Sequence, residues 1–377
     1  MEVRIATSME AVPAAAWNRL CGTENPFLRH EFLAALERHR CISPQTGWQP
    51  FHLLLYEDEC LLAAAPAYIK GHSWGEFVFD FSWAAAYEQH GLSYYPKLIV
   101  GVPYSPVTGK RALWAPEADP RRCLSTLAKA ARALLGEHGL SSVHWLFPEA
   151  EQADGLRAEG YAIRTGTQFH WTNHAYTDFH AFLGTMSAKK RKNIRQERRK
   201  VQEAGVEFRL LHGHEVDAAT WAVFDRFYRS TFHLYGNVPI LNRPFFEDIG
   251  RSLGDHVLLA LAYRAGKAIA GAFLMHGGGS LYGRYWGAEQ ELPGLHFETC
   301  YYQPIDYAIR VGMQRFEPGA QGEHKIARGF LPTPTYSAHW MKEPAMHDAV
   351  LDFTRREQAY VDHYASELST HSPFRKE

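Results

Sequence analysis

A succession of elements that occurs twice along the chain constrains its fold more than any other feature. Residues 51–70 and 256–277 each contain two apolar runs that flank a short polar turn, a pattern that predicts a β-hairpin. Each hairpin is followed by an aromatic-rich segment, at 74–81 and 280–288, which we expect to be a further strand.

Both halves then continue with the same order of elements. A helical pattern ends near Gly139 in the first half and near Gly312 in the second, and a short strand ending at a proline follows each glycine. Hairpin, strand, helix and strand form a mixed α/β order. The repetition predicts a tandem duplication of one α/β fold. The N-terminal domain is expected to contain residues 1–165, and the C-terminal domain residues 166–377, with the active site and a C-terminal helix.

The composition excludes several classes of protein. With 377 residues the chain is long enough for two domains, and its formal net charge of −1 gives no global attraction to nucleic acid or to an anionic membrane. The five cysteines are odd in number and form no CxxC pair, which argues against a disulfide framework or a structural zinc site. No apolar run approaches the ~18 residues needed to span a bilayer, and the N-terminus lacks the apolar core of a secretory signal. We therefore expect a cytoplasmic protein without stable membrane insertion, metal or permanently bound cofactor.

A strongly basic helix is predicted at residues 187–205. Ser187 and Gly205 are suited to its two ends, and the stretch between Lys189 and Lys200 holds eight basic residues and a single acid. Two interpretations fit this pattern: a solvated helix, or a helix whose cationic face binds the phosphates of a ligand, a lipid head group or RNA. The candidate phosphate-binding residues are Lys189, Arg191, Lys192 and Arg195.

Polar residues of several kinds gather between residues 282 and 309. Arg284 and Trp286 alternate on a predicted strand and therefore share a face, and a group around the start of the next helix includes Glu298, Tyr302 and Gln303. The chain has no HExxH, GxSxG, Walker A or GxGxxG motif, which disfavours zinc-protease, α/β-hydrolase, P-loop and dehydrogenase functions. A nucleophilic Cys300 is also disfavoured, because a lone cysteine is more often a packing residue.

A second polar cluster lies at residues 316–330, after the last predicted strand of the second half. Prolines and glycines bend this segment where the sheet ends, and open α/β sheets commonly bind ligands at that edge. Glu323 or His324 is suited to act as a general base, since partial burial and a neighbouring lysine tune the pKa of either group. The alternative is a loop whose polar side chains only cap neighbouring carbonyls. The candidate residues are Gln321, Glu323, His324, Lys325 and Arg328.

Long runs of the chain resemble one known family. The runs are NPFLRHEFLAALE (25–37), residues 67–87 and residues 95–111 in the first half, with KKRKNIRQER, YGRYWG, LHFETCYYQPIDYAI and FEPGAQGEHKIARGFLPTPTYSAHW in the second. Over nearly its whole length the chain resembles the FemAB-like predicted N-acyltransferases, a branch of the GNAT acyltransferase superfamily. The resemblance implies two GNAT-like domains in tandem and the transfer of an acyl or aminoacyl group to an amine.

The resemblance leaves two kinds of donor open. Ordinary GNAT enzymes use an acyl-CoA, whereas the related peptidoglycan-bridge enzymes use an aminoacyl-tRNA and a lipid-linked muropeptide acceptor. The GNAT loop that binds the CoA pyrophosphate has the form (Q/R)xxGx(G/A), but the corresponding run here, Arg284 to Glu289, ends in an acid that would repel a pyrophosphate. The first half offers a second anion-binding segment, with Tyr104, Lys110 and Arg111.

The leading hypothesis is a two-domain, GNAT-fold N-acyltransferase that acts on a peptidoglycan-type or other phosphorylated precursor, either a small molecule or a lipid-linked substrate. Arg284, Glu298, Glu323 and His324 are the candidate catalytic residues, and Lys325 and Arg328 would bind anionic groups or the developing oxyanion. Trp286, Tyr302, Gln303, Gln321 and the cationic residues of both halves complete the binding set. The alternative is a non-catalytic GNAT-like module that binds a phosphorylated glycan or lipid precursor, because a fold does not fix a function. A third interpretation, RNA binding through the basic helix, gains weight if the donor is an aminoacyl-tRNA.

Overall fold

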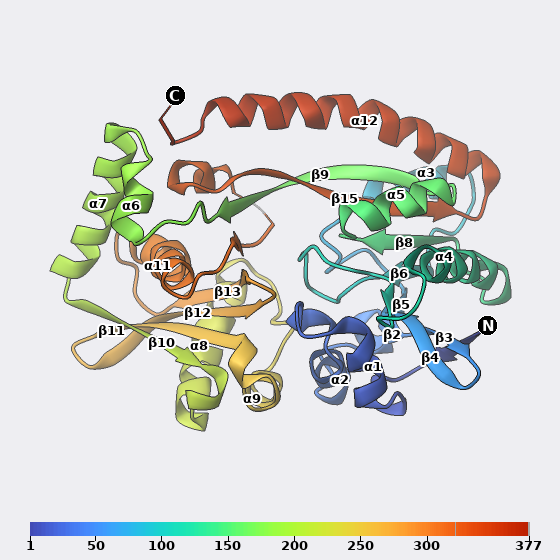
Figure 1. Ribbon diagram of the computed structural model, residues 1–377, viewed down its shortest axis with the longest axis horizontal. Helices are drawn as coiled ribbons and strands as arrows, with labels where there is room; N and C mark the ends of the chain where they lie inside the picture. The colour runs from blue at the N-terminus through green and yellow to red at the C-terminus, as the bar shows by residue number, and fades with distance from the viewer. Residues whose placement is uncertain (321, 376–377) are drawn as a thin grey trace. The chain divides into compact units, whose positions relative to one another are not determined.

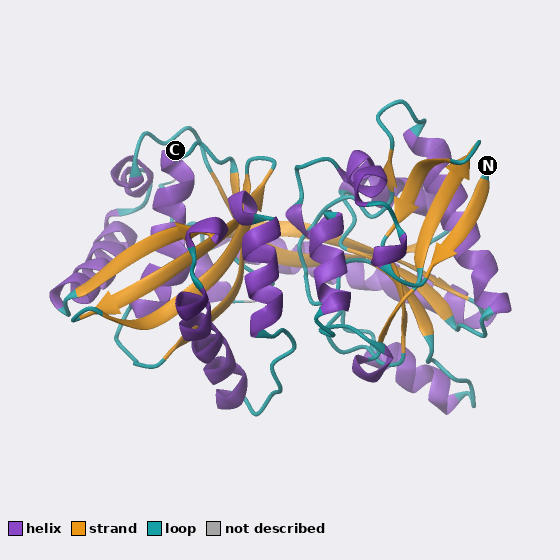
Figure 2. Cartoon of the chain, turned by 90° about the horizontal axis from the view of Figure 1, so that it is seen from below, coloured by secondary structure: helices purple, strands orange, loops and turns teal. Residues whose placement is uncertain are grey.

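The computed structural model describes residues 1–320 and 322–375, and their contacts divide the chain into two units. Unit 1 contains residues 1–167 and 334–365, and unit 2 contains residues 168–333 together with the chain from residue 366. Both units are mixed α/β structures (Figures 1 and 2). Among the described residues, no helix has the length and apolar character needed to cross a bilayer.

Unit 1 contains two sheets with helices packed against them. Its strands form a small sheet of order β1-β3-β4-β7 and part of a larger sheet of order β15-β8-β6-β5-β2. Its elements are β1 (Glu2–Ala6), α1 (Ala14–Cys21), α2 (His30–Arg38), β2 (Trp48–Pro50), β3 (His52–Glu57), β4 (Cys60–Ala65), β5 (Ala67–Lys70), α3 (Phe81–Gln89), β6 (Lys97–Val100), β7 (Leu113–Trp114), α4 (Pro120–Glu137), β8 (Ser142–Leu146), α5 (Ala150–Ala158), the first part of β9 (Ala162–Thr172), most of β15 (Leu331–Met341) and most of α12 (Pro344–Thr370).

The main core of unit 1 lies between its sheets and α4. Apolar residues of β3 and β4 meet those of β6 and β8 there, and the buried side of α4, including Leu127 and Ala131, closes the cluster. A second core lies under α3, where Trp83 and Tyr87 pack with Met346 and Val350 of α12. Burial of these side chains fixes which face each helix turns inward.

Unit 2 is built on an antiparallel sheet of order β10-β11-β12-β13, continued by β14 and the end of β9. Its elements are α6 (Phe179–Gly184), α7 (Ala188–Glu203), β10 (Val206–His212), α8 (Ala218–Leu234), α9 (Arg243–Ser252), β11 (Val257–Arg264), β12 (Lys267–Gly277), β13 (Ser280–Ala288), α10 (Leu295–Phe297), the π-helical turn η6 (Glu298–Tyr302), α11 (Gln303–Arg310), β14 (Arg315–Glu317) and the 3-10 segment η7 (Glu323–Arg328).

Helices cover both faces of this sheet (Figure 2). Phe224 and Tyr228 of α8 contact Phe273 and Tyr285 on one face, whereas Val201 of α7 joins the apolar cluster of the other face. The approach of α8 is so close that a Cβ atom at Gly287 would lie 1.7 Å from the Phe227 carbonyl oxygen. Only glycine allows this packing, which explains the glycine near the end of β13.

The structure confirms both predicted hairpins and both predicted helix ends. β3 pairs antiparallel with β4, and β11 pairs antiparallel with β12. Gly139 follows α4 with φ +64°, and Gly312 follows α11 with φ +74°, which is the left-handed conformation of a glycine C′ residue. The basic helix is also confirmed as α7, with Ile194 and Val201 buried on its inner side.

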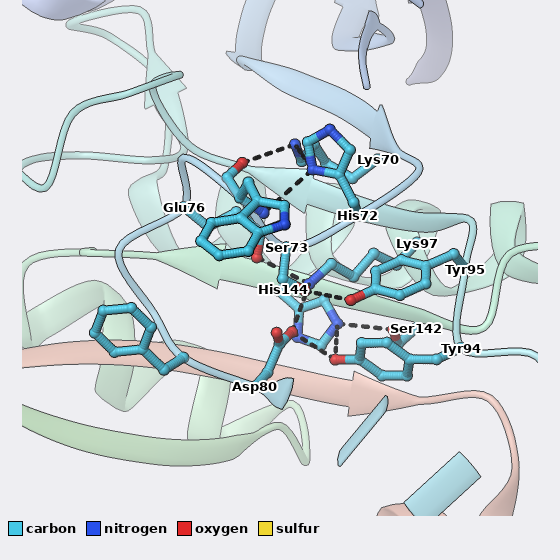
Figure 3. A network of polar contacts seen from close by, with 12 residues as sticks. Lys70, His72, Ser73, Glu76, Asp80, Tyr94, Tyr95, Lys97, Ser142 and His144 are labelled. Carbon is cyan, nitrogen blue, oxygen red and sulfur yellow. Dashed lines mark hydrogen bonds and ion pairs between the residues drawn. The ribbon is translucent and has the colours of Figure 1, made fainter. Parts of the chain in front are cut away.

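The prediction of a strand at residues 74–81 is wrong. This segment is a loop between β5 and α3, because its two carboxylates turn inward to the buried ammonium of Lys97 (Figure 3). Glu76 and Asp80 are four residues apart and bind the same partner, so the backbone between them curves and cannot extend as a strand. The equivalent prediction at 280–288 is confirmed as β13.

The C-terminal part of the chain departs from the expected division into residues 1–165 and 166–377. Residues 334–365 group with unit 1, since Ser337–Met341 of β15 pair antiparallel with Ser142–Leu146 of β8. Hydrophobic burial of the first turns of α12 against α3 adds to this pairing. The sequence pattern marks where a strand occurs but does not identify the strand with which it pairs.

Candidate active site

A pocket of about 310 Å³ in unit 2 brings together four of the predicted site residues: Arg284, Trp286, His324 and Lys325. They come from β13 and η7, and residues of β12, α10, η6 and the 318–320 turn complete the lining. No acidic side chain is among the described lining residues, so the pocket is cationic and suits an anionic or carbonyl-bearing ligand.

Arg284 stands at an irregularity in its strand. Phe273 of β12 pairs with Tyr285, but the next residue, Leu274, pairs with Gly283, so Arg284 is an additional residue in β13. Such a bulge bends the strand and re-aims the side chain at that position. The chain after β14 also approaches here, because a Cβ atom at Gly283 would lie 3.3 Å from the Pro318 Cα. Gly283, Arg284 and Pro318 all line the pocket, so the bulge and the approaching chain are both part of its wall.

The short helix α10 and the π-helical turn η6 form another part of the pocket wall. His296, Cys300 and Tyr301 line the pocket from this region, and the His296 ring lies 5.1 Å from that of Trp286. A π-helical turn inserts one residue into a helix, and such turns are frequent at functional sites. These three residues were not among the predicted site residues. The i, i+4 spacing of His296 and Cys300 was the available signal, but the wider turn that includes Tyr301 cannot be read from an α-helical pattern.

His324 is an exposed residue that forms a hydrogen bond within the pocket. Its Nε2 lies 3.0 Å from the Tyr301 hydroxyl. Partial burial, with the nearby cations Lys325 and Arg328, lowers the pKa of His324 below its usual value, and burial raises the pKa of Tyr301. The same effects lower the pKa of His296 to about 4. Both imidazoles are therefore neutral at pH 7, and the phenol keeps its proton.

Lys325 is the most deeply buried cation of the pocket. Its side chain is almost fully buried, its Nζ donates to the Gly319 carbonyl at 2.8 Å, and burial lowers its pKa to about 8. Burial also raises the pKa of Cys300, which disfavours a thiolate nucleophile. Glu323 is exposed and does not line the pocket, and Gln321 lies outside the described residues.

The remaining predicted residues of this region form an ion network next to the pocket. Arg198 of α7 pairs with the buried Glu298 at 3.0 Å, and Gln303 donates to the same carboxylate at 2.8 Å. Burial raises the pKa of Glu298, although Arg198 opposes this effect. The network attaches the basic helix to η6 and so supports the wall of the pocket.

A second carboxylate of α7 completes this network. Glu197 accepts from Arg328 at 2.8 Å and from the Tyr302 hydroxyl. The Arg328 guanidinium carbon also lies 3.3 Å from the centre of the Phe297 ring, and its Nη1 donates to the His324 carbonyl. Arg328 is therefore engaged by the protein itself and positions η7 rather than lining the pocket.

The outer side of α7 carries a cationic groove of about 420 Å³. Its lining residues are Ala188, Arg191, Lys192, Arg195, Gln196 and Arg199. Three of the four basic residues predicted to bind phosphate thus share one surface, and the fourth, Lys189, is an exposed neighbour at the start of the helix.

The predicted anion-binding residues of the first half lie in unit 1. Arg111 is buried and donates to the carbonyls of Val107, Lys110 and Leu146, and the Tyr104 hydroxyl donates to the Cys41 carbonyl at 3.1 Å. The Lys110 ammonium lies 5.5 Å from the Trp114 ring centre. None of the three lines the pocket of unit 2. Among the described residues, no His, Cys, Asp and Glu side chains gather in a group that could hold a metal.

One family model matches the chain over almost its entire length. The FemAB-like model, described as peptidoglycan biosynthesis/recognition, matches residues 8–376. The chain belongs to the FemAB-like family. This match confirms the family that the sequence resembles, and the family description concerns peptidoglycan biosynthesis or recognition. The comparison with curated proteins found no match.

Solved structures share the fold of this FemAB-like chain at low sequence identity. FemX superposes with a TM-score of 0.53 at 10% identity, over 90% of this chain and 97% of FemX. The C-terminal domain of a putative lysylphosphatidylglycerol synthetase from Agrobacterium fabrum gives 0.54 at 11% identity, over 90% and 94% of the two chains. L-PGS from Bacillus licheniformis gives 0.52 at 12% identity, over 89% and 98%. At these identities the likeness concerns the fold.

Proposed function

We propose that this FemAB-like chain transfers an aminoacyl or acyl group to the amine of a peptidoglycan-type precursor, and that the reaction takes place in the pocket of unit 2. The observation that carries the proposal is the convergence of Arg284, His324 and Lys325 in one pocket without an acid among its described lining residues. Acyl transfer needs a base for the amine and positive charge for the developing oxyanion, and this pocket offers both.

The roles of the residues follow from their charges. The amine nitrogen attacks the carbonyl carbon of the donor, and His324, which is neutral at pH 7, accepts the proton that the nitrogen loses. The carbonyl oxygen becomes an oxyanion, which the cations of Lys325 and Arg284 stabilise. When the tetrahedral intermediate collapses, the bond to the donor oxygen or sulfur breaks, and that atom leaves with the proton held by His324. Tyr301 orients the imidazole through its hydrogen bond.

An aminoacyl-tRNA is the favoured donor. Glu289 ends the run that would bind a CoA pyrophosphate. Its backbone N–H donates to the Ile269 carbonyl at 2.8 Å. Its carboxylate pairs with Arg226 and Lys267. At the start of the following helix, a Cβ atom at Gly294 would lie 3.2 Å from the Glu197 carbonyl oxygen. The backbone N–H and the carboxylate of Glu289, in the turn after β13, already have partners within the protein, which disfavours a CoA pyrophosphate there. The α7 groove, in contrast, offers exposed cations suited to RNA phosphates.

An aminoacyl-transfer assay with variants of neighbouring residues tests the role of the pocket. The purified full chain is supplied with aminoacyl-tRNAs or acyl-CoAs and a lipid-linked or soluble muropeptide. We expect His324→Ala to lower the rate by about 10²-fold or more, as the loss of a general base does. Glu323→Gln is the matched control, since this exposed neighbour does not line the pocket, and it should retain activity.

The outcomes of the assay separate the possible bases and the alternative function. Loss of activity in Glu323→Gln with retention in His324→Ala would transfer the role of base to Glu323. Full turnover in both variants would refute the assignment of the base to either residue. Binding of a muropeptide without transfer from any donor would instead support the non-catalytic binding module.

A further inference from the structure

In the loop between β5 and the start of α3, acidic side chains are buried and large aromatic side chains are exposed, the opposite of their usual placement. In this segment, which we call the aromatic loop (residues 71–81), Glu76 and Asp80 are buried, whereas Trp74 is 70% exposed and Phe79 is 58% exposed. Phe77 and Phe81 are exposed as well. A buried carboxylate and an exposed cluster of large apolar side chains are each unusual, and the two together indicate a surface that interacts with a partner.

Buried polar contacts hold the aromatic loop in this arrangement (Figure 3). The fully buried Lys97 ammonium pairs with Glu76 at 2.8 Å, pairs with Asp80, and donates to Ser73 at 2.8 Å. The Tyr94 hydroxyl donates to Asp80 at 2.6 Å. Loss of one partner of such a buried cluster is strongly destabilising. The contacts with Lys97 therefore hold the backbone of the aromatic loop in place where it faces the core. The aromatic side chains are therefore held outward by the ion pairs.

The aromatic loop and the first turns of α3, up to Tyr87, present no exposed charged side chain of their own. Over residues 71–87, all of which the structure describes, the carboxylates of Glu76 and Asp80 are the only acidic groups, there is no lysine or arginine, and both carboxylates are buried. Burial also lowers the pKa of His72, which is therefore neutral at pH 7. Arg164 donates to the Phe79 carbonyl from outside the segment, and its charge is compensated by a bidentate pair with Glu357.

The apolar surface continues along the first turns of α3. Ser82 and Ala85 are exposed there beside Phe81, and the rings of Trp74 and Phe81 lie 5.5 Å apart. Nucleic acid is a poor partner for this surface because the segment that carries the aromatic rings, the described residues 71–87, contributes no exposed cation. A glycan is also a poor partner, since the polar side chains of the loop that could bind hydroxyl groups are already engaged. Ser73, Glu76 and Asp80 contact Lys97, and His72 bonds to the Thr46 carbonyl.

We propose that the aromatic loop docks on a lipid surface by inserting Trp74, Phe77, Phe79 and Phe81 into the bilayer interface. The neutral face complements the uncharged region between head groups and acyl chains, where amphipathic aromatic rings are favoured. The binding is peripheral, because the described residues contain no helix that could span a membrane. This surface lies in unit 1 and uses none of the pocket residues of unit 2, so the inference does not depend on the proposed reaction.

Cosedimentation of the full chain with phosphatidylcholine vesicles tests the inference without donor or acceptor. The wild-type chain should bind these uncharged vesicles, with little change between low and high salt. Trp74→Ser/Phe79→Ser should lower the partition coefficient at least tenfold. The matched control is Leu234→Ser/Val238→Ser, which removes two apolar side chains of unit 2 that are 72% and 81% exposed, and it should bind as the wild type does.

Fluorescence quenching by brominated lipids gives a second measurement that does not rely on the double variant folding. Bilayer-embedded bromines should quench part of the tryptophan emission of the wild type, and Trp74→Phe should remove most of that quenching while still binding. Failure of the wild type to bind neutral vesicles, or equal quenching in Trp74→Phe, would overturn the proposal. Binding that requires anionic lipid and disappears at high salt would overturn the proposal in favour of electrostatic binding through the α7 groove. Protection of Trp74 by a soluble oligosaccharide would overturn it in favour of a glycan ligand.

Discussion

At the scale of single residues, the sequence indicates which kinds of side chain the pocket contains better than it indicates which individual residues line it. Arg284, Trp286, His324 and Lys325 could be selected because each stands in a locally unusual run of polar residues. Glu298 and Arg328 stand in the same runs, but the structure engages them with Arg198 and Glu197 of α7, more than 90 positions away. A sequence shows the charge of a side chain and not its partner, so this distinction could not be made beforehand.

Lys325 gives the pocket a pH dependence that can be measured. Burial lowers its pKa to about 8 from an ordinary value of 10.5, so its charge is present below pH 8 and is lost as the pH rises through that value. If this charge stabilises the oxyanion, kcat/KM should fall about tenfold for each pH unit above 8. Lys325→Arg should retain activity at pH 9, because a guanidinium keeps its charge there.

The uncharged variant Lys325→Met is the control for this prediction. It should be impaired at every pH and show no decline centred on pH 8. An alkaline decline that persists unchanged in Lys325→Arg, in a variant whose thermal stability matches the wild type, would assign the ionisation to another group.

At the scale of elements, local patterns predicted helices and hairpins well but failed where side chains reverse their usual placement. α7 was predicted correctly because its ends and its apolar pair, Ile194 and Val201, are all local signals. The segment 74–81 resembles a strand in composition, since aromatic residues favour strands. Its conformation depends on Lys97, which is distant in sequence, and the dependence becomes visible only when the buried ion pairs are known.

The groove on α7 predicts a salt dependence for tRNA binding. Each contact between a protein cation and an RNA phosphate contributes about 0.7 to 0.9 to the slope of log K against log salt. Arg191→Ala/Arg195→Ala should therefore weaken tRNA binding and reduce that slope by about 1.4 to 1.8 in fluorescence-anisotropy titrations at several salt concentrations. Arg121→Ala, which removes an exposed arginine at the start of α4, is the control and should leave the slope unchanged. A slope that is the same in the double variant as in the wild type would exclude the groove as the tRNA site.

At the scale of the whole molecule, the duplicated pattern predicted the tandem fold, whereas the route of the chain between the two units could not be predicted. The repeated hairpins and helix ends are properties of short windows, and each is visible in the sequence. The return of residues 334–365 to unit 1 depends on which strand β15 pairs with, and any strand of either half presents similar hydrogen-bonding groups. The choice is made by long-range packing, of Met341 with Trp83 for example.

This return makes the stability of unit 1 depend on residues that follow unit 2 in the sequence. A chain ending at Thr333 loses the pairing of β8 with β15 and the burial of Met341, Met346 and Val350. Burial of three such side chains contributes about 5 to 9 kcal/mol, which is comparable to the entire stability of a domain at about 5 to 15 kcal/mol. Hydrogen exchange at the β8 amides, residues 142–146, should therefore be at least a hundredfold faster in this chain than in the full-length protein. A chain ending at Ala365 keeps β15 and most of α12, so its β8 amides should remain protected. If the β8 amides are equally protected in both shortened chains, residues 1–167 fold without the C-terminal segment, and the boundary lies where the sequence alone would put it.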